Sequence, residues 1–204
     1  MDTRVAIEPA GIADGQPVGL FWGFRVGTYG GARLELDTRT FLAGNRITRA
    51  FPYGGGDSFD ASRCSPDTCG TCGISADVMT VRWDGGSVDR WSFEVTPDGV
   101  KLDGTLFRPA RSMSAAGVVG EWTSSQAGGN PFSNVYQFEA DGTFGFGAAG
   151  NMLRGRYAID GLTLALNFDD GTASRRTLFS ASRQEPAGLI GVEGDVYARR
   201  TSEA

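Results

Sequence analysis

The sequence predicts an all-β protein built from two tandem antiparallel meander units that pack against each other. Three observations support this fold class: the chain resembles itself along its length, apolar and polar residues alternate over short segments, and Asp-Gly pairs recur between those segments. Glycine is abundant, at 31 of 204 residues, as expected for short strands joined by tight turns. Because alternation with period two leaves one apolar face on each strand, that face must be covered by a second sheet or by closure into a barrel.

The internal repeat emerges when the two halves of the sequence are aligned. Residues 83–87 match residues 168–172 at an offset of 85, and residues 100–107 match residues 190–197 at an offset of 90. Two earlier matches have larger offsets: residues 41–45 with 138–142 at 97, and residues 19–21 with 120–122 at 101. Offsets that change along the chain indicate loops of different length between equivalent strands.

The elements of the first unit follow from these patterns in order. Residues 1–17 are polar and broken by Pro and Gly, which predicts a flexible leader. The first unit then covers residues 18–112, with alternating strands around residues 20–26, 79–83 and 90–95. A long loop rich in Gly and Cys, residues 53–73, interrupts it. We expect seven or eight short strands in this unit.

The second unit covers residues 113–204 and has the clearest alternation, at residues 162–168. Asp-Gly pairs mark its hairpin turns, as at Asp141-Gly142, because glycine tolerates the positive φ that such turns need. The connection between the units, residues 110–117, is short and made mostly of small residues. We therefore expect the two units to pack together.

Three motifs of the second unit resemble the small bacterial lipocalin-like domains: Gly120-Glu121-Trp122, residues 136–144 with their Asp-Gly-Thr-aromatic ending, and residues 155–164. The resemblance covers about 80 residues of this unit and extends more faintly to the first, where Cys72 stands at the position of Tyr157. It implies calycin-type β-barrels or half-barrels. Members of that family often hold small apolar molecules.

The chain has no histidine, which removes Ser-His-Asp and Cys-His nucleophiles and every imidazole metal site. The Asp residues fall mainly in turns, where their carboxylates bond nearby backbone amides. We expect no cofactor, and an enzyme is the less favoured class.

All three cysteines fall in one segment, Cys64, Cys69 and Cys72, with the spacing C-x4-C-x2-C. An iron–sulfur cluster would need a fourth cysteine, and a zinc site would need Asp57, Asp60 or Asp67 to complete it. We expect free thiols, with a Cys64–Cys69 disulfide and, less favoured, a metal site as the alternatives.

The loop before the cysteines is longer than its counterpart in the second unit, which makes it a candidate partner loop. Phe59, with Asp57 and Asp60, is the candidate anchor for a protein partner. A surface insertion with one buried aromatic side chain is the alternative.

Candidate ligand-binding residues are the aromatic side chains expected on the inner faces of the strands. They are Trp22, Trp83, Trp91, Trp122, Tyr136, Phe138 and Tyr157. The alternative is that these rings only fill the interior. Arg90 and Arg175 occupy equivalent positions that point away from the apolar face, so we expect them to be solvated.

The leading function is a non-enzymatic binding protein that holds a small apolar molecule or a protein partner on the duplicated scaffold. The alternatives are a structural or assembly component that self-assembles through strand edges, and a cofactor-free isomerase or cyclase with a barrel cavity. A net charge of −5 disfavours nucleic-acid or membrane partners. Residues 1–9 lack the features of a secretory signal, so we expect a cytoplasmic protein, unless an export signal is missing from this sequence or secretion is non-classical.

Overall fold

The computed structural model describes residues 3–27, 33–124, 134–148, 151–182 and 187–200. It confirms the all-β fold class and the two tandem antiparallel units. The chain divides into one unit of Met1–Pro52 with Asp57–Ala110 and another of Tyr53–Gly56 with Arg111–Ala204. No helix among the described residues is long and apolar enough to cross a membrane.

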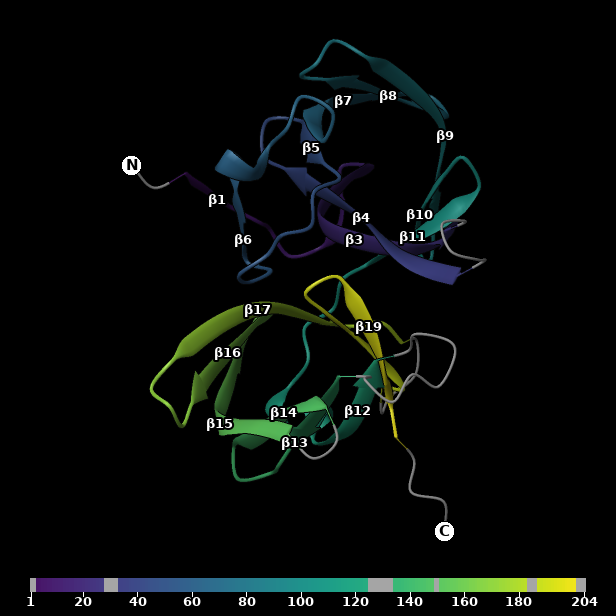
Figure 1. Cartoon of the computed structure of the whole chain (residues 1–204). Helices are drawn as coiled ribbons and strands as arrows, with labels where there is room; N and C mark the ends of the chain where they lie inside the picture. The colour runs from purple at the N-terminus through teal and green to yellow at the C-terminus, as the bar shows by residue number, and fades with distance from the viewer. Residues whose placement is uncertain (1–2, 28–32, 125–133, 149–150, 183–186, 201–204) are drawn as a thin grey trace. The chain divides into compact units, whose positions relative to one another are not determined.

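The first unit is a closed antiparallel barrel (Figure 1). Its strands are β1 (Arg4–Ala6), β2 (Gly11–Ala13), β3 (Gln16–Gly27), β4 (Arg33–Leu42), β5 (Arg46–Thr48), β6 (Ser58–Asp60), β7 (Cys69–Ser75), β8 (Val78–Trp83), β9 (Val88–Thr96), β10 (Gly99–Leu102) and β11 (Thr105–Pro109), with the 3-10 helix η1 (Ala61–Arg63) after β6. The ring runs β3-β4-β5-β7-β8-β9-β10-β11 and closes where β11 pairs with β3, with Pro109 opposite Phe21. Strand β2 adds to β3, and β1 pairs with β6.

The residues expected to form a flexible leader are ordered in the structure from Thr3 onward. Strand β1 pairs with β6, β2 pairs with the start of β3, and Ile7 is buried. The reason lies at Gly19, where a Cβ atom would stand 2.4 Å from the carbonyl oxygen of Glu8. Because Gly19 has no side chain, the backbone of residues 8–10 can cross directly over β3, and Ala10 packs against the core of this barrel.

The second unit is also a closed antiparallel barrel. Its elements are α1 (Ala115–Val118), β12 (Gly120–Ser124), β13 (Val135–Phe138), β14 (Thr143–Ala148), β15 (Asn151–Asp160), β16 (Thr163–Phe168), β17 (Ala173–Ser180), β18 (Leu189–Val192) and β19 (Asp195–Arg199). The strands pair in chain order, and β19 closes the ring on β12 with Arg199 opposite Trp122. Ser114 caps α1 by accepting a hydrogen bond from the Gly117 amide.

Part of the long loop of the first repeat belongs to the second unit. The Gly56 amide donates to the Leu162 carbonyl at 3.1 Å, and the Gly54 amide donates to Oε1 of Glu193 at 3.2 Å. A Cβ on Gly56 would lie 2.5 Å from the Cβ of Leu162, so glycine is required for this close approach. This packing lets Tyr53–Gly56 cover the outward side of β17, where Thr177 is fully buried.

The two barrels share one pairing register, which confirms the internal repeat. Phe21 pairs with Arg39 in β3 and β4, and the equivalent pair in β12 and β13 is Trp122 with Tyr136. Matches of the same kind recur in the remaining strands: Gly70–Trp83 with Gly155–Phe168, Met79–Trp91 with Leu164–Arg176, and Val100–Phe107 with Ile190–Tyr197. Equivalent residues therefore occupy equivalent places in the two barrels.

Candidate functional site

The structure buries six of the seven predicted aromatic residues and leaves Trp91 partly exposed, which makes the two barrels different. In the second barrel Trp122 and Tyr136 are 0% exposed and Phe138 is 1% exposed. A side chain with no accessible area has no space for a water molecule beside it, so these rings fill the interior. Tyr136 stacks on Phe138 at 5.4 Å between centroids, and Tyr157 packs edge-on against Phe138 at 4.9 Å.

In the first barrel, Trp83 and Trp91 come together at 6.1 Å between ring centroids. Trp83 belongs to the core, and Trp91 packs against that core but remains partly exposed. Trp22 lies elsewhere: it alternates with the inward Phe21, pairs with Arg108 of β11, and so points away from the barrel interior. The structure therefore separates Trp22 from the other predicted ligand-binding residues of this barrel.

An arginine that sequence reasoning missed crosses the interior of the first barrel. The guanidinium of Arg39, on β4, lies 5.5 Å from the ring centroid of Trp91 on β9 and 5.0 Å from that of Phe107 on β11. In the ring of described strands, three strands separate β4 from β9 in either direction. Because the two strands face each other across the barrel, the Arg39 side chain spans the lumen.

One edge of the Arg39 guanidinium has no partner within the described residues. Nη1 donates to Oδ1 of Asp37 at 2.5 Å and to the carbonyl oxygen of Thr38 at 2.7 Å. Nε is buried without a hydrogen-bond acceptor, and no acceptor in the described part of the chain binds Nη2. The Arg39 and Asp37 side chains are 13% and 19% exposed, so water reaches this polar group inside the barrel.

The second barrel also has an arginine in contact with aromatic rings, but there the arginine and the ring lie on exchanged strands. The guanidinium of Arg176, on β17, lies 4.5 Å from the Phe146 ring centroid and 5.6 Å from that of Tyr136, and its Nη1 donates to the Tyr136 hydroxyl. Burial raises the pKa of Tyr136 to about 12, against the opposing effect of the Arg176 charge. Tyr136 is therefore a neutral hydroxyl at physiological pH.

The exchange follows from the shared register. Arg39 of β4 corresponds to Tyr136 of β13, and Trp91 of β9 corresponds to Arg176 of β17. Each barrel thus places one arginine and one aromatic ring on the same two opposite strands. In the second barrel the ring carries a hydroxyl that binds the guanidinium, whereas the Trp91 ring in the first barrel offers no oxygen acceptor.

Further charged groups line the same face of β3, β4 and β9. Arg25 forms an ion pair with Glu35 at 3.1 Å, in register with the Phe21–Arg39 pair four residues along each strand. Asp89 accepts a hydrogen bond from Nε1 of Trp83 at 2.7 Å. The interior of the first barrel therefore has one layer of apolar side chains and one layer of charged side chains, and Arg39 lies between the two.

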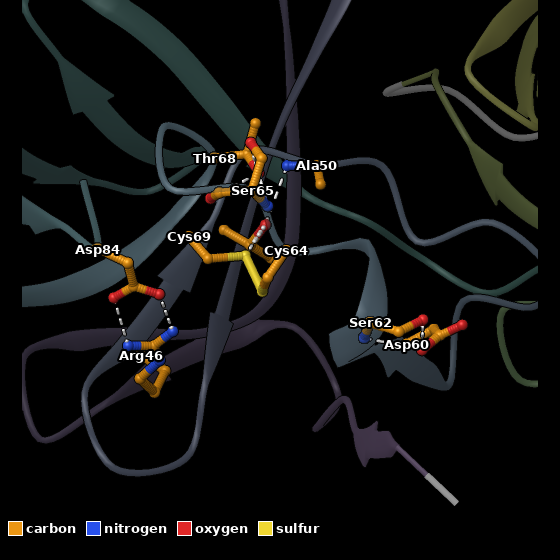
Figure 2. Close-up of a disulfide and its surroundings, with 10 residues drawn as sticks. Arg46, Ala50, Asp60, Ser62, Cys64, Ser65, Thr68, Cys69 and Asp84 are labelled. Carbon is orange, nitrogen blue, oxygen red and sulfur yellow. Dashed lines mark hydrogen bonds and ion pairs between the residues drawn. A yellow bond between two sulfur atoms is a disulfide. The ribbon is translucent and has the colours of Figure 1, made fainter.

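The predicted partner loop does not present Phe59. Phe59 is 1% exposed and pairs with Val5 in the β1–β6 ribbon, as in the alternative of a surface insertion with one buried aromatic side chain. Asp60 caps η1 through the Ser62 amide at 3.0 Å (Figure 2). Hydrogen bonds from the Ser62 and Thr3 hydroxyls, together with this amide, lower the pKa of its carboxyl to about 2. The Asp57 carbonyl accepts from the Ile7 amide. These three residues hold the N-terminal ribbon.

Cys64 and Cys69 form a disulfide, the alternative to the free thiols that we expected (Figure 2). The Thr68 amide donates to the Ser65 carbonyl at 3.0 Å, and this turn brings the two cysteines to 5.4 Å between Cα atoms. Sulfur atoms bonded to each other cannot serve as thiolate ligands, which argues against the metal alternative. Cys72 remains a thiol, and burial raises its pKa to about 11.

We expect thiol counting to detect this bridge. Denatured protein should show one reactive thiol without reductant and three after reduction, because only Cys72 is free. A colorimetric thiol assay on freshly extracted, unalkylated protein, denatured with and without reductant, makes the measurement. Three thiols without reductant would mean that the bridge does not form where the protein resides, as expected in a reducing cytoplasm.

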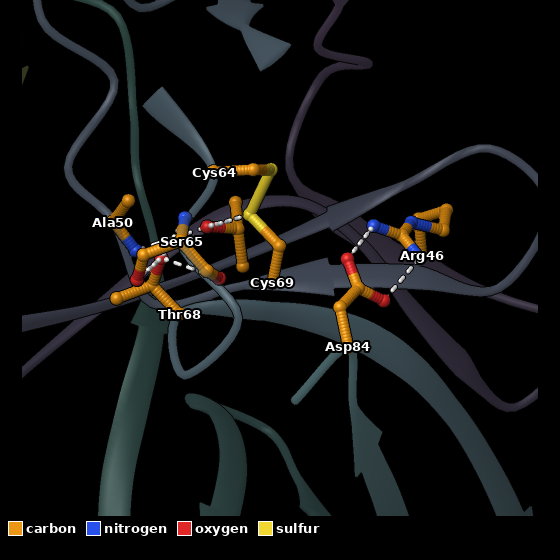
Figure 3. A network of polar contacts seen from close by, with 8 residues as sticks. Arg46, Ala50, Cys64, Ser65, Thr68, Cys69 and Asp84 are labelled. Atoms are coloured by element: carbon orange, nitrogen blue, oxygen red, sulfur yellow. Dashed lines mark hydrogen bonds and ion pairs between the residues drawn. A yellow bond between two sulfur atoms is a disulfide. The ribbon is translucent and has the colours of Figure 1, made fainter. Parts of the chain in front are cut away.

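Near the disulfide, Arg46 of β5 donates two hydrogen bonds, of 2.9 and 2.7 Å, to the carboxylate of Asp84 (Figure 3). Asp84 belongs to an Asp-Gly turn, and the hydrogen bond from Arg46 lowers the pKa of its carboxyl. Asp141 and Asp170 behave as expected for turn residues, each accepting from the amide two positions later. These carboxylates therefore stabilise turns.

A groove of about 440 Å³ lies on the outer wall of the second barrel. Arg154 and Arg156 line it together with Glu139 and Asp169, so its charges balance. Both arginines are exposed to solvent. Arg90 and Arg175 are exposed as well, as the alternation predicts.

Comparisons with protein-family models, curated proteins and solved structures find no match to this chain.

Proposed function

We propose that this chain is a non-enzymatic binding protein that holds a small, largely apolar molecule inside its first barrel. The observation that carries this proposal is the difference between the two interiors. Trp91 is partly exposed although it faces the lumen of the first barrel, whereas Tyr136, the ring that contacts the interior arginine of the second barrel, is fully buried. The resemblance to lipocalin-like domains supports the same function, since members of that family often hold apolar molecules.

The chemistry of the first lumen fits binding better than catalysis. Its inward carboxylates Asp37, Glu35 and Asp89 each have a partner in an arginine or an indole N–H. A general base needs a carboxylate that can reach the substrate proton, and paired groups of this kind hold an interior in place. The aromatic and aliphatic side chains below them supply an apolar surface for a ligand.

Fluorescence titration with a neutral apolar probe, N-phenyl-1-naphthylamine, tests the proposal. We expect saturable probe emission at one site per chain, with energy transfer from tryptophan. Trp91→Ala should weaken binding at least about fivefold, since it removes a ring that lines the site. Val88→Ala, an exposed change on the same strand, should leave binding unchanged.

Two results would overturn the proposal. One is the absence of saturable binding by apolar probes, neutral or acidic. The other is a large particle in sizing chromatography together with no probe binding, which is the behaviour of an assembly component.

A further inference from the structure

We infer that the molecule held by the first barrel carries a carboxylate, and that the Nε–Nη2 edge of Arg39 binds it. This inference rests on the proposed binding function and adds the chemical class of the ligand. Nothing in the apolar layer of the barrel would select between an acid and a neutral molecule of the same shape. Arg39 is the group that can do so.

The Arg39 guanidinium binds protein acceptors on one side only. Asp37 and the Thr38 carbonyl both bind Nη1, which leaves Nε and Nη2 on the other side of the group. Those two N–H groups are parallel and form the edge that matches the two oxygens of a carboxylate. A buried donor without a partner, as Nε is here, is costly, and a ligand oxygen would satisfy it once the side chains that cover it move aside.

Aromatic rings surround the Arg39 guanidinium. The rings of Trp91 and Phe107 lie within 5.5 Å and 5.0 Å of the guanidinium carbon, so the charge sits among apolar groups. A carboxylate that binds Arg39 would carry its apolar remainder into contact with those rings. The ligand class that fits is therefore a small apolar or aromatic acid with one carboxylate.

The two repeats differ in what their interior arginine binds. In the second barrel Arg176 occupies the position equivalent to Trp91, and the hydroxyl of Tyr136 lies on its Nη1. With Tyr136 fully buried, a ligand has no room there. The duplicated scaffold thus leaves one arginine with an unpartnered donor in the first barrel and pairs the other with a tyrosine hydroxyl in the second.

Asp37 should have the opposite effect to Arg39 on the binding of an acid. Its carboxylate neutralises part of the Arg39 charge and would repel a bound acid across the guanidinium. Removing that charge with Asp37→Asn should strengthen binding of an acid and leave binding of a neutral molecule unchanged. A purely structural Asp37–Arg39 pair would not produce this difference.

The test compares 1-naphthaleneacetate with its neutral analogue 1-naphthaleneacetamide by calorimetry and tryptophan quenching on the full chain. We expect the acid to bind at least about tenfold more tightly than the amide. Arg39→Met should abolish that preference, and Arg39→Lys should reduce it, since lysine keeps the charge but not the paired edge. Arg90→Met, a change at an exposed arginine, is the matched control and should retain the preference.

The outcomes separate this inference from the function on which it rests. Equal binding of acid and amide, or a preference that survives Arg39→Met in a protein with unchanged circular dichroism, would overturn the carboxylate assignment alone, provided that N-phenyl-1-naphthylamine still binds. Loss of binding by all three probes would overturn the binding function itself. If Arg39→Met fails to fold, the Asp37→Asn comparison decides: no gain in acid affinity would contradict the inference.

Discussion

Replacing Gly155 with alanine is expected to destabilise the second unit by about 3 kcal/mol, the upper end of the cost of overpacking. A Cβ at this position would stand 2.0 Å from the carbonyl oxygen of Asn167 and 2.8 Å from the Cα of Phe168. Both atoms belong to the backbone of β16, so β15 and β16 would have to separate. The equivalent change, Gly70→Ala, meets the carbonyl oxygen of Arg82 at 2.3 Å and should destabilise the first unit similarly.

Gly73→Ala is the matched control for both changes. Gly73 lies on β7 with no heavy atom within 4 Å of its would-be Cβ, so alanine should be neutral or stabilise by up to about 1 kcal/mol. Urea unfolding followed by fluorescence measures the three variants. Free energies of unfolding for Gly155→Ala and Gly70→Ala that match Gly73→Ala would contradict the shared close approach of strands in the two barrels.

Replacing Arg199 with methionine is expected to lower the free energy of unfolding of the second unit by about 3 kcal/mol or more. Arg199 donates to the carbonyl oxygens of Gly117, Val119 and Ala187 at 2.7, 2.7 and 3.1 Å. Its guanidinium also lies 4.4 Å from the ring centroid of the fully buried Trp122. Methionine preserves much of the packing and leaves the three carbonyls without this donor.

The neighbouring Arg200 provides the control. Its ion pair with Glu121 is exposed, with the Arg200 side chain 69% accessible, so Arg200→Met should change stability by less than about 0.5 kcal/mol. Chemical unfolding of the two variants should therefore differ clearly. Equal stability of Arg199→Met and Arg200→Met would show that the hydrogen bonds from Arg199 to the carbonyls of Gly117, Val119 and Ala187 do not stabilise the second unit.

The fold could be predicted from sequence because its cause is local and repeated. Alternation with period two sets which side chains of β8 and β16 face inward, and the 85-residue offset aligns Met79 with Leu164. The segment that we expected to be flexible is ordered because its backbone packs against Gly19. A sequence pattern based on alternating residues does not show that a glycine will be approached in this way. The assignment of Tyr53–Gly56 to the second unit likewise depends on glycines that contact residues far away in the sequence.

The candidate site was less accessible to sequence reasoning. Arg39 and Arg176 occupy inward positions of strands that otherwise carry apolar residues there, so a search for apolar faces passes over them. The repeat offsets in the sequence could have revealed these arginines, because they align Arg39 with Tyr136 and Trp91 with Arg176. That exchange becomes meaningful only once β4 is known to face β9 across the barrel.

The most direct test of the central claim, that a ligand occupies the first barrel beside Trp91, is fluorine NMR of protein labelled with 5-fluorotryptophan. The sequence has four tryptophans, so single Trp→Phe variants assign each resonance. On titration with 1-naphthaleneacetate we expect the Trp91 signal to shift and the signal of the fully buried Trp122 to stay in place. A shift at Trp122 without one at Trp91, or four unmoved signals at saturating probe, would contradict the account.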